Sequence, residues 1–477
     1  MDSKKILVGW SSRDVTPDKP TTLAGQFNTR ISEFVKDPVT ATALALETAG
    51  GDQAIIVSLD AVWIKDDSRD ACRKKLSELI PDFDPQKLLI SVTHTHTAPS
   101  QSSSFFGYPE LNDPDIMKPA EYSKLLTEKL IEICVEAWNN RKPGAIAWGY
   151  GHAVAGFNRR VSYFDGSTQM YGKTNVPEFS HIEGYEDQSV DMLFTYDDKH
   201  RLTGMIINLA CPSQVTEGAS FVSADFWHET REDIRKRHGK KLFILPQCSA
   251  AGDLSPHLML HKREQERMFK LKGLINQENP DFNIAQRKEI AQRIAAAVDE
   301  VLPLASADIQ DTVPFAHTVA TIQLPRRKIS EDEAKFCSEQ MFRHQEALKT
   351  CDQNPKSAAY SVNYVKAGYF GFAVKRFNEQ ASNPVLPMES HVIRLGDVAF
   401  ATNRFELFLD FGIRIKARSK AVQTFVIQLA GEGSYLPTQK AVDAKSYGAG
   451  APDNLVGPEG GQVLVEEQLK AINGLFE

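Results

Sequence analysis

The stretch Leu-Leu-Ile-Ser-Val-Thr-His-Thr-His-Thr-Ala-Pro at residues 88–99 joins a clear strand pattern to the sharpest chemical motif in the chain. Its first half is a β-branched, apolar run that is typical of a buried strand. Side chains at i and i+2 of a strand lie on one face, so a strand over 88–96 would project His94 and His96 together from its end. Two neighbouring imidazoles suit a divalent transition metal, most often zinc, or a general base. The alternative is a pair of histidines satisfied by hydrogen bonds at a strand end.

Strand and helix patterns alternate on both sides of this stretch. Strands are expected at 54–62, 88–94, 242–245 and 391–402, and helices at 121–139, 286–302 and 405–418. No internal repeat or low-complexity linker divides the chain. The pattern predicts an α/β fold with mixed β-sheets flanked by helices, formed as one large unit over residues 1–477. The polar, charge-rich segment 258–285 is a possible helical insertion in that unit.

Composition narrows the class of protein. Of the 477 residues, 42% are hydrophobic and 25% are charged, which predicts a sizeable core and excludes wholesale disorder. The formal net charge is −7 and no block of basic residues occurs, which argues against nucleic acid as a partner. No run approaches about 18 uninterrupted apolar residues, so no membrane span is expected.

The N-terminus and the cysteines bear on the cellular compartment. Only Ile6, Leu7 and Val8 precede Gly9 as an apolar run, which is too short for the core of a signal peptide. The six cysteines are widely spaced and include no CxxC pair, so reduced thiols are expected. These features predict a cytoplasmic protein, although an exported chain trimmed of its leader would look the same.

A second motif, Ala-Ala-Gly-Asp-Leu-Ser-Pro-His at 250–257, follows the predicted strand at 242–245. Small residues after a buried strand let the backbone turn sharply, and the turn could present the hydroxyl of Ser255 as a nucleophile. The motif is not the GxSxG elbow of α/β-hydrolases. The alternative is an ordinary Asp/Ser turn whose side chains bond the nearby backbone.

Three further segments carry polar groups but are weak when taken singly. Cys211 ends a predicted strand, and a cysteine is often simply a small buried hydrophobe. Glu406 is expected in the first turn of a helix, where a carboxylate complements the helix dipole. Tyr435 and Tyr447 lie in predicted loops, where tyrosines usually only pack.

Taken in order, these motifs resemble the neutral (non-lysosomal) ceramidase superfamily over most of the chain. The matching positions are Gly9, Asp14, Thr16 and Pro17, then Thr-His-Thr-His-Thr-Ala-Pro at 93–99, Asn158-Arg159, Gly-Asp-Leu-Ser-Pro at 252–256, Glu406 with Gly412 and Arg414, and Tyr435 and Tyr447. The two longer motifs in this order are a fairly specific combination. The resemblance implies the catalytic domain of that family and zinc as the cofactor.

The resemblance also implies a role for each matching side chain. It assigns four zinc ligands, which are His94, Cys211, Glu406 and Tyr435. It assigns three groups to the reaction, which are His96 beside the metal, Arg159 facing the reacting group and Ser255 as nucleophile or essential hydroxyl. Tyr447 matches a position of the family pattern and is the fourth residue that we expect in the reaction, acting with Arg159.

Departures from the family pattern bear on the substrate. The family's second zinc histidine lies in a His-Pro dipeptide, which is Cys211-Pro212 here. A thiolate is a good zinc ligand, so the site could still bind zinc with sulfur in place of a histidine nitrogen, or it could have lost its metal. His257 stands where ceramidases carry Asn. The chain ends soon after Tyr447, so no C-terminal immunoglobulin-like domain is expected, and no lipid-facing apolar stretch is apparent. Ceramide itself is therefore not the expected substrate.

Three functions remain open. The first is a zinc-dependent hydrolase of an amide or acyl bond, in which His96 moves protons while Arg159 and Tyr447 stabilise the oxyanion. The second is a zinc-dependent lyase or dehydratase that acts on uronate-containing oligosaccharides, with a histidine or tyrosine as base. The third is a metal-free binding protein on the same fold. In each case the expected partner is a small molecule or an oligosaccharide.

Overall fold

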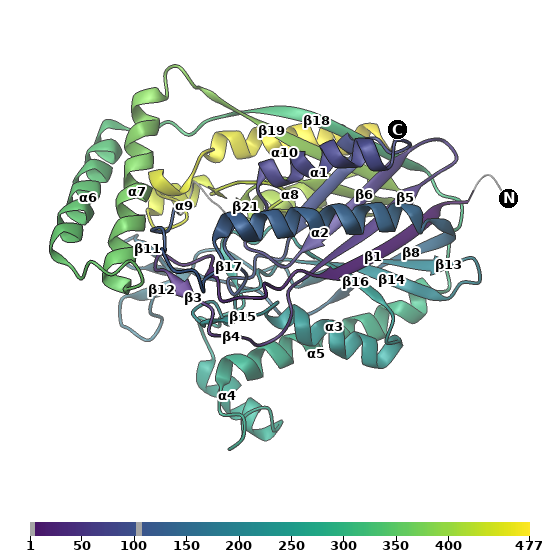
Figure 1. The fold of residues 1–477 in the computed structure, drawn as a ribbon, viewed down its shortest axis with the longest axis horizontal. Coiled ribbons are helices and arrows are strands. Elements are labelled where there is room, and N and C mark those ends of the chain that lie inside the picture. The colour runs from purple at the N-terminus through teal and green to yellow at the C-terminus, as the bar shows by residue number, and fades with distance from the viewer. Residues whose placement is uncertain (1–4, 102–106) are drawn as a thin grey trace.

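Two β-sheets face each other at the centre of the protein, and helices cover both outer faces (Figure 1). The computed structural model describes residues 5–101 and 107–477. The larger sheet has eight strands, in spatial order β16 (Phe243–Cys248), β14 (Leu202–Leu209), β13 (Ser189–Asp197), β8 (Lys142–His152), β1 (Leu7–Asp14), β5 (Thr40–Glu47), β6 (Gln53–Leu59) and β7 (Leu88–Val92). The smaller has four, which are β18 (Phe315–Pro325), β19 (Val385–Leu395), β20 (Val398–Thr402) and β22 (Gln423–Ile427). Both sheets mix parallel and antiparallel pairs.

Alternation along each strand explains this layering, because successive side chains of a strand point to opposite faces. In β5, Ala41 and Ala43 face the helix layer, whereas Leu44 and Leu46 face the smaller sheet. Small side chains on the outer face let the helices pack closely, and large ones fill the space between the sheets. From the smaller sheet, β20 and β22 stack two phenylalanine rings into the same space, with centroids 4.4 Å apart.

In the part of the chain that the structure describes, six helices cover the outer faces of the two sheets. Against the larger sheet pack α1 (Asp66–Leu79), α2 (Pro119–Asn139), α3 (Phe226–His238) and α5 (Phe282–Ala305). Against the smaller sheet pack α8 (Leu409–Arg418) and α10 (Pro458–Gly474). Each presents an apolar stripe to the sheet beneath it, which is the usual way a surface helix buries its hydrophobic side chains.

The remaining elements extend from this frame. Figure 1 shows α6 (Glu331–Thr350) and α7 (Ala358–Glu379) side by side at one end and α4 (Lys262–Leu271) projecting beyond α5. A small sheet joins β10 (Arg160–Tyr163) with β11 (Thr168–Met170) and β12 (Phe179–Ile182). The short pairs are β2 (Thr22–Leu23) with β3 (Arg30–Ile31), β4 (Phe34–Val35) with β15 (Phe221–Val222), β9 (Phe157–Asn158) with β17 (Leu254–Ser255), and β21 (Glu406–Leu407) with β23 (Tyr435–Leu436). A short helix, α9 (Gln439–Ala444), follows β23.

The mixed α/β architecture predicted from the sequence is confirmed, with differences at particular elements. The expected strand at 391–402 is wrong as a single element, because the chain reverses at Gly396, whose φ of +64° favours glycine, between β19 and β20. The segment 258–285 contains α4 and the first turn of α5. No helix in the described ranges has the length and apolar character that crossing a membrane requires.

Candidate active site

The two histidines of the Thr-His-Thr-His motif come together, but not on a continuous strand. The expected strand over 88–96 is wrong beyond Val92, where β7 ends, and His94 has φ of 63°. The Nε2 atoms of His94 and His96 are nevertheless 3.3 Å apart. The Nδ1 atom of His94 lies 2.9 Å from the Val62 carbonyl, which can only accept, so Nδ1 donates there and Nε2 is the ring nitrogen that faces the site. A backbone held in this left-handed region costs about 1–3 kcal/mol and is typical of functional sites.

Glu406 and Tyr435 face each other across the two-residue ladder of β21 and β23. The expectation that Glu406 opens a helix is wrong, because α8 begins only at Leu409. Its Oε2 atom lies 3.3 Å from the Nε2 atom of His94. Burial, together with the negative charge of Glu406, raises the pKa of the Tyr435 phenol well above its usual value. An imidazole and a carboxylate, which both bind zinc in proteins, therefore meet here, and the Tyr435 phenol lies beside the carboxylate.

Cys211 is not brought into this group. It is buried directly after β14, and its thiol donates to the Pro212 carbonyl with an Sγ–O distance of 3.6 Å. Burial, and then the neighbouring Cys248, raises the pKa of the thiol well above its usual value. Among residues 5–101 and 107–477, no three His, Cys, Asp or Glu side chains are arranged to hold a metal ion. The imidazole of His94 and the carboxylate of Glu406 fit zinc by their chemistry, and the Tyr435 phenol beside Glu406 offers a further oxygen. The hydrogen bond of His94 Nδ1 to a carbonyl is the usual support of a zinc-binding histidine.

The Gly-Asp-Leu-Ser-Pro motif lies beside Arg159 because β17 pairs with β9, aligning Ser255 with Phe157. Gly252 is needed here, since a Cβ atom at this position would collide with the Glu406 carbonyl. Asp253 ties the two sides together by accepting from the side-chain amide of Asn158 at 3.1 Å and from the backbone N–H of Leu409 at 2.8 Å. The motif therefore acts as the joint between the Arg159 segment and the Glu406 segment.

Arg159 reaches the centre of the site from this joint. Its guanidinium donates to the Gly252 carbonyl at 3.0 Å, to the Tyr435 hydroxyl at 3.3 Å and to the Tyr171 hydroxyl at 2.9 Å. The Tyr171 hydroxyl is also 3.1 Å from the Oγ atom of Ser255. Tyr447 packs its ring edge-to-face on Tyr435, with centroids 5.6 Å apart. His96 thus contacts His94, and Arg159 and Tyr447 contact Tyr435. Ser255 is linked to Arg159 through the hydroxyl of Tyr171.

Sequence reasoning missed three side chains of this site, which are Tyr171, Gln214 and Glu217. The carboxylate of Glu217 lies 3.6 Å from the Nδ1 atom of His96 and 3.5 Å from the Nε2 atom of His257. Burial, followed by the neighbouring His94 and Arg30, holds the pKa of His96 well below its ordinary value. A weak signal existed for Gln214 and Glu217, because they lie in the polar loop that follows Cys211.

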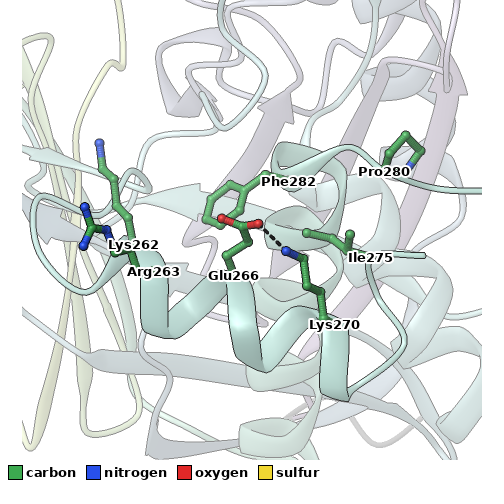
Figure 2. Close-up of a pocket in the computed structure, with 7 residues that line it drawn as sticks. All are labelled: Lys262, Arg263, Glu266, Lys270, Ile275, Pro280 and Phe282. Atoms are coloured by element: carbon green, nitrogen blue, oxygen red, sulfur yellow. Dashed lines mark hydrogen bonds and ion pairs between the residues drawn. The ribbon is translucent and has the colours of Figure 1, made fainter. Parts of the chain in front are cut away.

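A large surface pocket lies elsewhere and contains none of these residues. It has a volume of about 620 Å³ and is formed by α4 and the segment leading into α5 (Figure 2). Figure 2 shows Glu266 and Lys270 of α4 paired at its rim, with a distance of 2.6 Å between Oε1 and Nζ. The pocket is lined by Lys262, Arg263, Glu266, Lys270, Ile275, Pro280 and Phe282. The candidate active site is therefore identified by its connected polar side chains and not by the size of a cavity.

Comparisons with known proteins bear on the fold. No protein-family model matches the sequence, and no curated protein matches it. Among solved structures, the neutral ceramidase from Pseudomonas aeruginosa is similar, with a TM-score of 0.69 and 16% sequence identity over 99% of this chain and 75% of that one. A ceramidase complexed with C2 is similar with a TM-score of 0.67 and 15% identity over the same shares. The chain therefore has a neutral-ceramidase-like fold.

Proposed function

We propose that this protein is a zinc-dependent hydrolase that cleaves an amide or similar acyl bond in a polar substrate. The observation that carries the proposal is the meeting of His94, Glu406 and Tyr435 next to His96 and Arg159. Metal-binding groups, a proton carrier and a fixed cation are the parts that hydrolysis of an acyl bond requires. The likeness in fold to ceramidases supports the same reaction class.

The metal would be held by the Nε2 atom of His94, the carboxylate of Glu406 and the hydroxyl of Tyr435. When bound, zinc lowers the pKa of a water molecule toward neutrality and polarises a substrate carbonyl. Cys211 can serve as a further ligand only if its thiol leaves the Pro212 carbonyl and loses its proton. We therefore treat the Cys211 ligand as the least supported part of the proposed zinc site.

The other side chains of the site would each have a separate role in the reaction. The Nε2 atom of His96 faces the donors, so it is placed to take a proton from water and deliver it to the leaving group. On the other edge of its ring, Nδ1 faces Glu217, whose negative charge would stabilise the imidazole after it has taken a proton. Arg159, with Tyr447, would stabilise the negative charge that develops on the carbonyl oxygen. Ser255 would orient the scissile bond or attack it.

The polarity of the site supports a polar substrate. The contacts around His96 and Arg159 are with carboxylate, imidazole, phenol, amide and hydroxyl groups. A long lipid chain gains its binding energy from apolar surface, and these side chains offer little of it. Ceramide is for this reason a poor candidate, and an acylated amino sugar or amino acid is a better one.

The test is the release of a primary amine. Zinc-loaded protein is incubated with N-acetylglucosamine, N-acetyl amino acids and N-acylsphingosine, and free amine is measured against a chelator-treated sample and a His94→Ala variant. The proposal predicts turnover of one of the first two classes by the zinc-loaded wild type alone. Equal amine release by His94→Ala, or none from any compound, would refute it.

A lyase acting on uronate-containing oligosaccharides is the second candidate. One observation favours it: the Arg159 guanidinium points into the site among phenols, and guanidinium groups pair readily with carboxylates. A phenol or imidazole could then act as the base at the α-carbon. Elimination would appear as new enol-ether absorbance without amine release, which separates the two reactions in one panel.

A further inference from the structure

The hydroxyl of Tyr171 is the centre of a small hydrogen-bond network. Tyr171 follows β11 with φ of 56°, a left-handed conformation that is uncommon for a bulky side chain. Its oxygen accepts from the side-chain N–H of Gln214 at 2.6 Å and from a guanidinium N–H of Arg159 at 2.9 Å. Its other neighbour is the Oγ atom of Ser255 at 3.1 Å.

The direction of these hydrogen bonds follows from counting lone pairs. A phenolic oxygen has one proton to donate and two lone pairs, and both lone pairs are taken by N–H groups that can only donate. The Tyr171 proton must therefore go to Ser255. The Oγ atom of Ser255 also accepts the backbone N–H of His257 at 3.1 Å. With two donors aimed at it, this oxygen has no lone pair left, and only its own proton is free.

Three of the four side chains in this network are buried, whereas Tyr171 is 38% exposed. Ser255 and Gln214 are fully buried and Arg159 is nearly so. A nucleophilic serine needs a base to remove its proton, normally an imidazole or carboxylate within hydrogen-bond distance. In the described structure the partners of Ser255 Oγ are instead two donors. A chain of donors that begins at a cation polarises each member and strengthens the last donor.

We propose that Arg159, Gln214, Tyr171 and Ser255 form a one-way donor chain that ends in the Ser255 hydroxyl. Tyr171 is a positioning residue that commits Ser255 to donating its proton to a substrate oxygen. This inference rests on the proposed function and deepens it, because it assigns the substrate an acceptor oxygen at Ser255, namely the acyl carbonyl or the product carboxylate. It also removes the nucleophilic role from Ser255.

The kinetic test uses Tyr171→Phe, Ser255→Ala and the double variant on the substrate that releases amine. Loss of one preorganised donor typically costs about 10²-fold or more in turnover, so we expect about 10²-fold for Ser255→Ala and roughly tenfold for Tyr171→Phe. The double variant should turn over substrate no more slowly than Ser255→Ala, because Tyr171 acts only by directing the proton of Ser255. The matched control is Tyr196→Phe, whose hydroxyl lies 3.0 Å from the Oγ atom of Ser306 away from the site, and it should retain full activity.

Two further measurements do not depend on amide turnover. After treatment with a fluorophosphonate, mass spectrometry should show no label on Ser255. A label on Ser255 would overturn the proposal. Butyrate, whose only polar group is a carboxylate, should bind the wild type and Tyr196→Phe alike and bind Tyr171→Phe and Ser255→Ala several-fold more weakly. Equal binding by all four proteins, or none by the wild type, would overturn the donor chain. If no substrate releases amine but butyrate shows this pattern, the proposed function fails while the donor chain stands.

Discussion

The contact between Gly25 and the ring of His96 gives a sharp way to test the acid–base role of that histidine. Gly25 has φ of +96°, and a Cβ atom added there would lie 2.5 Å from Cγ and 2.6 Å from Nδ1 of the His96 ring. Ordinary contact begins at 3.4 Å, so Gly25→Ala would have to move this ring by about 0.9 Å. Cγ is the first atom of the ring and cannot swing aside as the end of a flexible chain can.

The expected magnitude has two parts. An alanine in the left-handed region costs about 1–2 kcal/mol of stability. Displacing a catalytic group by about 1 Å can cost on the order of 10²-fold in rate. Gly51 separates these parts, because it has a similar φ of +87° but nothing within 4 Å of the added Cβ. Gly51→Ala should therefore lose stability through backbone strain without displacing the His96 ring.

The assay compares kcat/KM and the urea midpoint of both variants with those of the wild type. We expect both variants to unfold more easily, and only Gly25→Ala to lose about 10²-fold in kcat/KM. If Gly25→Ala stays within twofold of Gly51→Ala in kcat/KM, the position of the His96 ring does not control the reaction and the assigned role is wrong.

Further outcomes follow from single side chains. His96→Ala should keep its bound zinc, measured by elemental analysis, yet lose about 10²- to 10⁴-fold in turnover, and full turnover would contradict the mechanism. Arg231→Met should lower the free energy of unfolding in urea by about 3–5 kcal/mol, because it strands the buried carboxylate of Asp60, which Arg231 holds with N–O distances of 2.8 and 3.0 Å; a loss below about 1 kcal/mol would refute this. Burial, and then His391, lowers the pKa of His317 from 6.5 to about 3, so the unfolded chain binds more protons between these values. Through His317, the free energy of unfolding should therefore fall by up to about 1.4 kcal/mol per pH unit as the pH drops below 6.5. Urea titrations at pH 7 and pH 4.5 should show a smaller decrease in this free energy for His317→Gln than for the wild type.

The sequence predicts the strands best where β-branched residues run together. β6 and β7 are such runs, and both were expected. β5 was missed because its sequence, Thr-Ala-Thr-Ala-Leu-Ala-Leu-Glu, alternates threonine or leucine with alanine, a weak strand former. β19 and β20 were merged because the turn between them is short and the apolar pattern continues through it.

The residues of the candidate site also differ in whether the sequence predicts them. His94, Ser255 and Glu406 lie in or beside motifs that can be recognised along the chain. Tyr171 and Glu217 do not, since they reach the site through a small sheet and a loop whose return path no local pattern specifies. The partner of the Cys211 thiol was also beyond prediction, because it depends on a rotamer inside a packed core.

The pairing of Glu406 with Tyr435 across β21 and β23 also determines how late in synthesis the site can assemble. His94 leaves the ribosome about 340 residues before Tyr435, which at roughly 5–20 residues per second is a delay of roughly 20–70 s. During most of that interval the nascent chain can form β7 but lacks the carboxylate of Glu406, and until its end it lacks the phenol of Tyr435 that pairs beside Glu406. A ribosome stalled anywhere before β23 would therefore display a chain with both imidazoles in place and no complete set of donors. The proposed zinc site could therefore be completed only after Tyr435 has been synthesised.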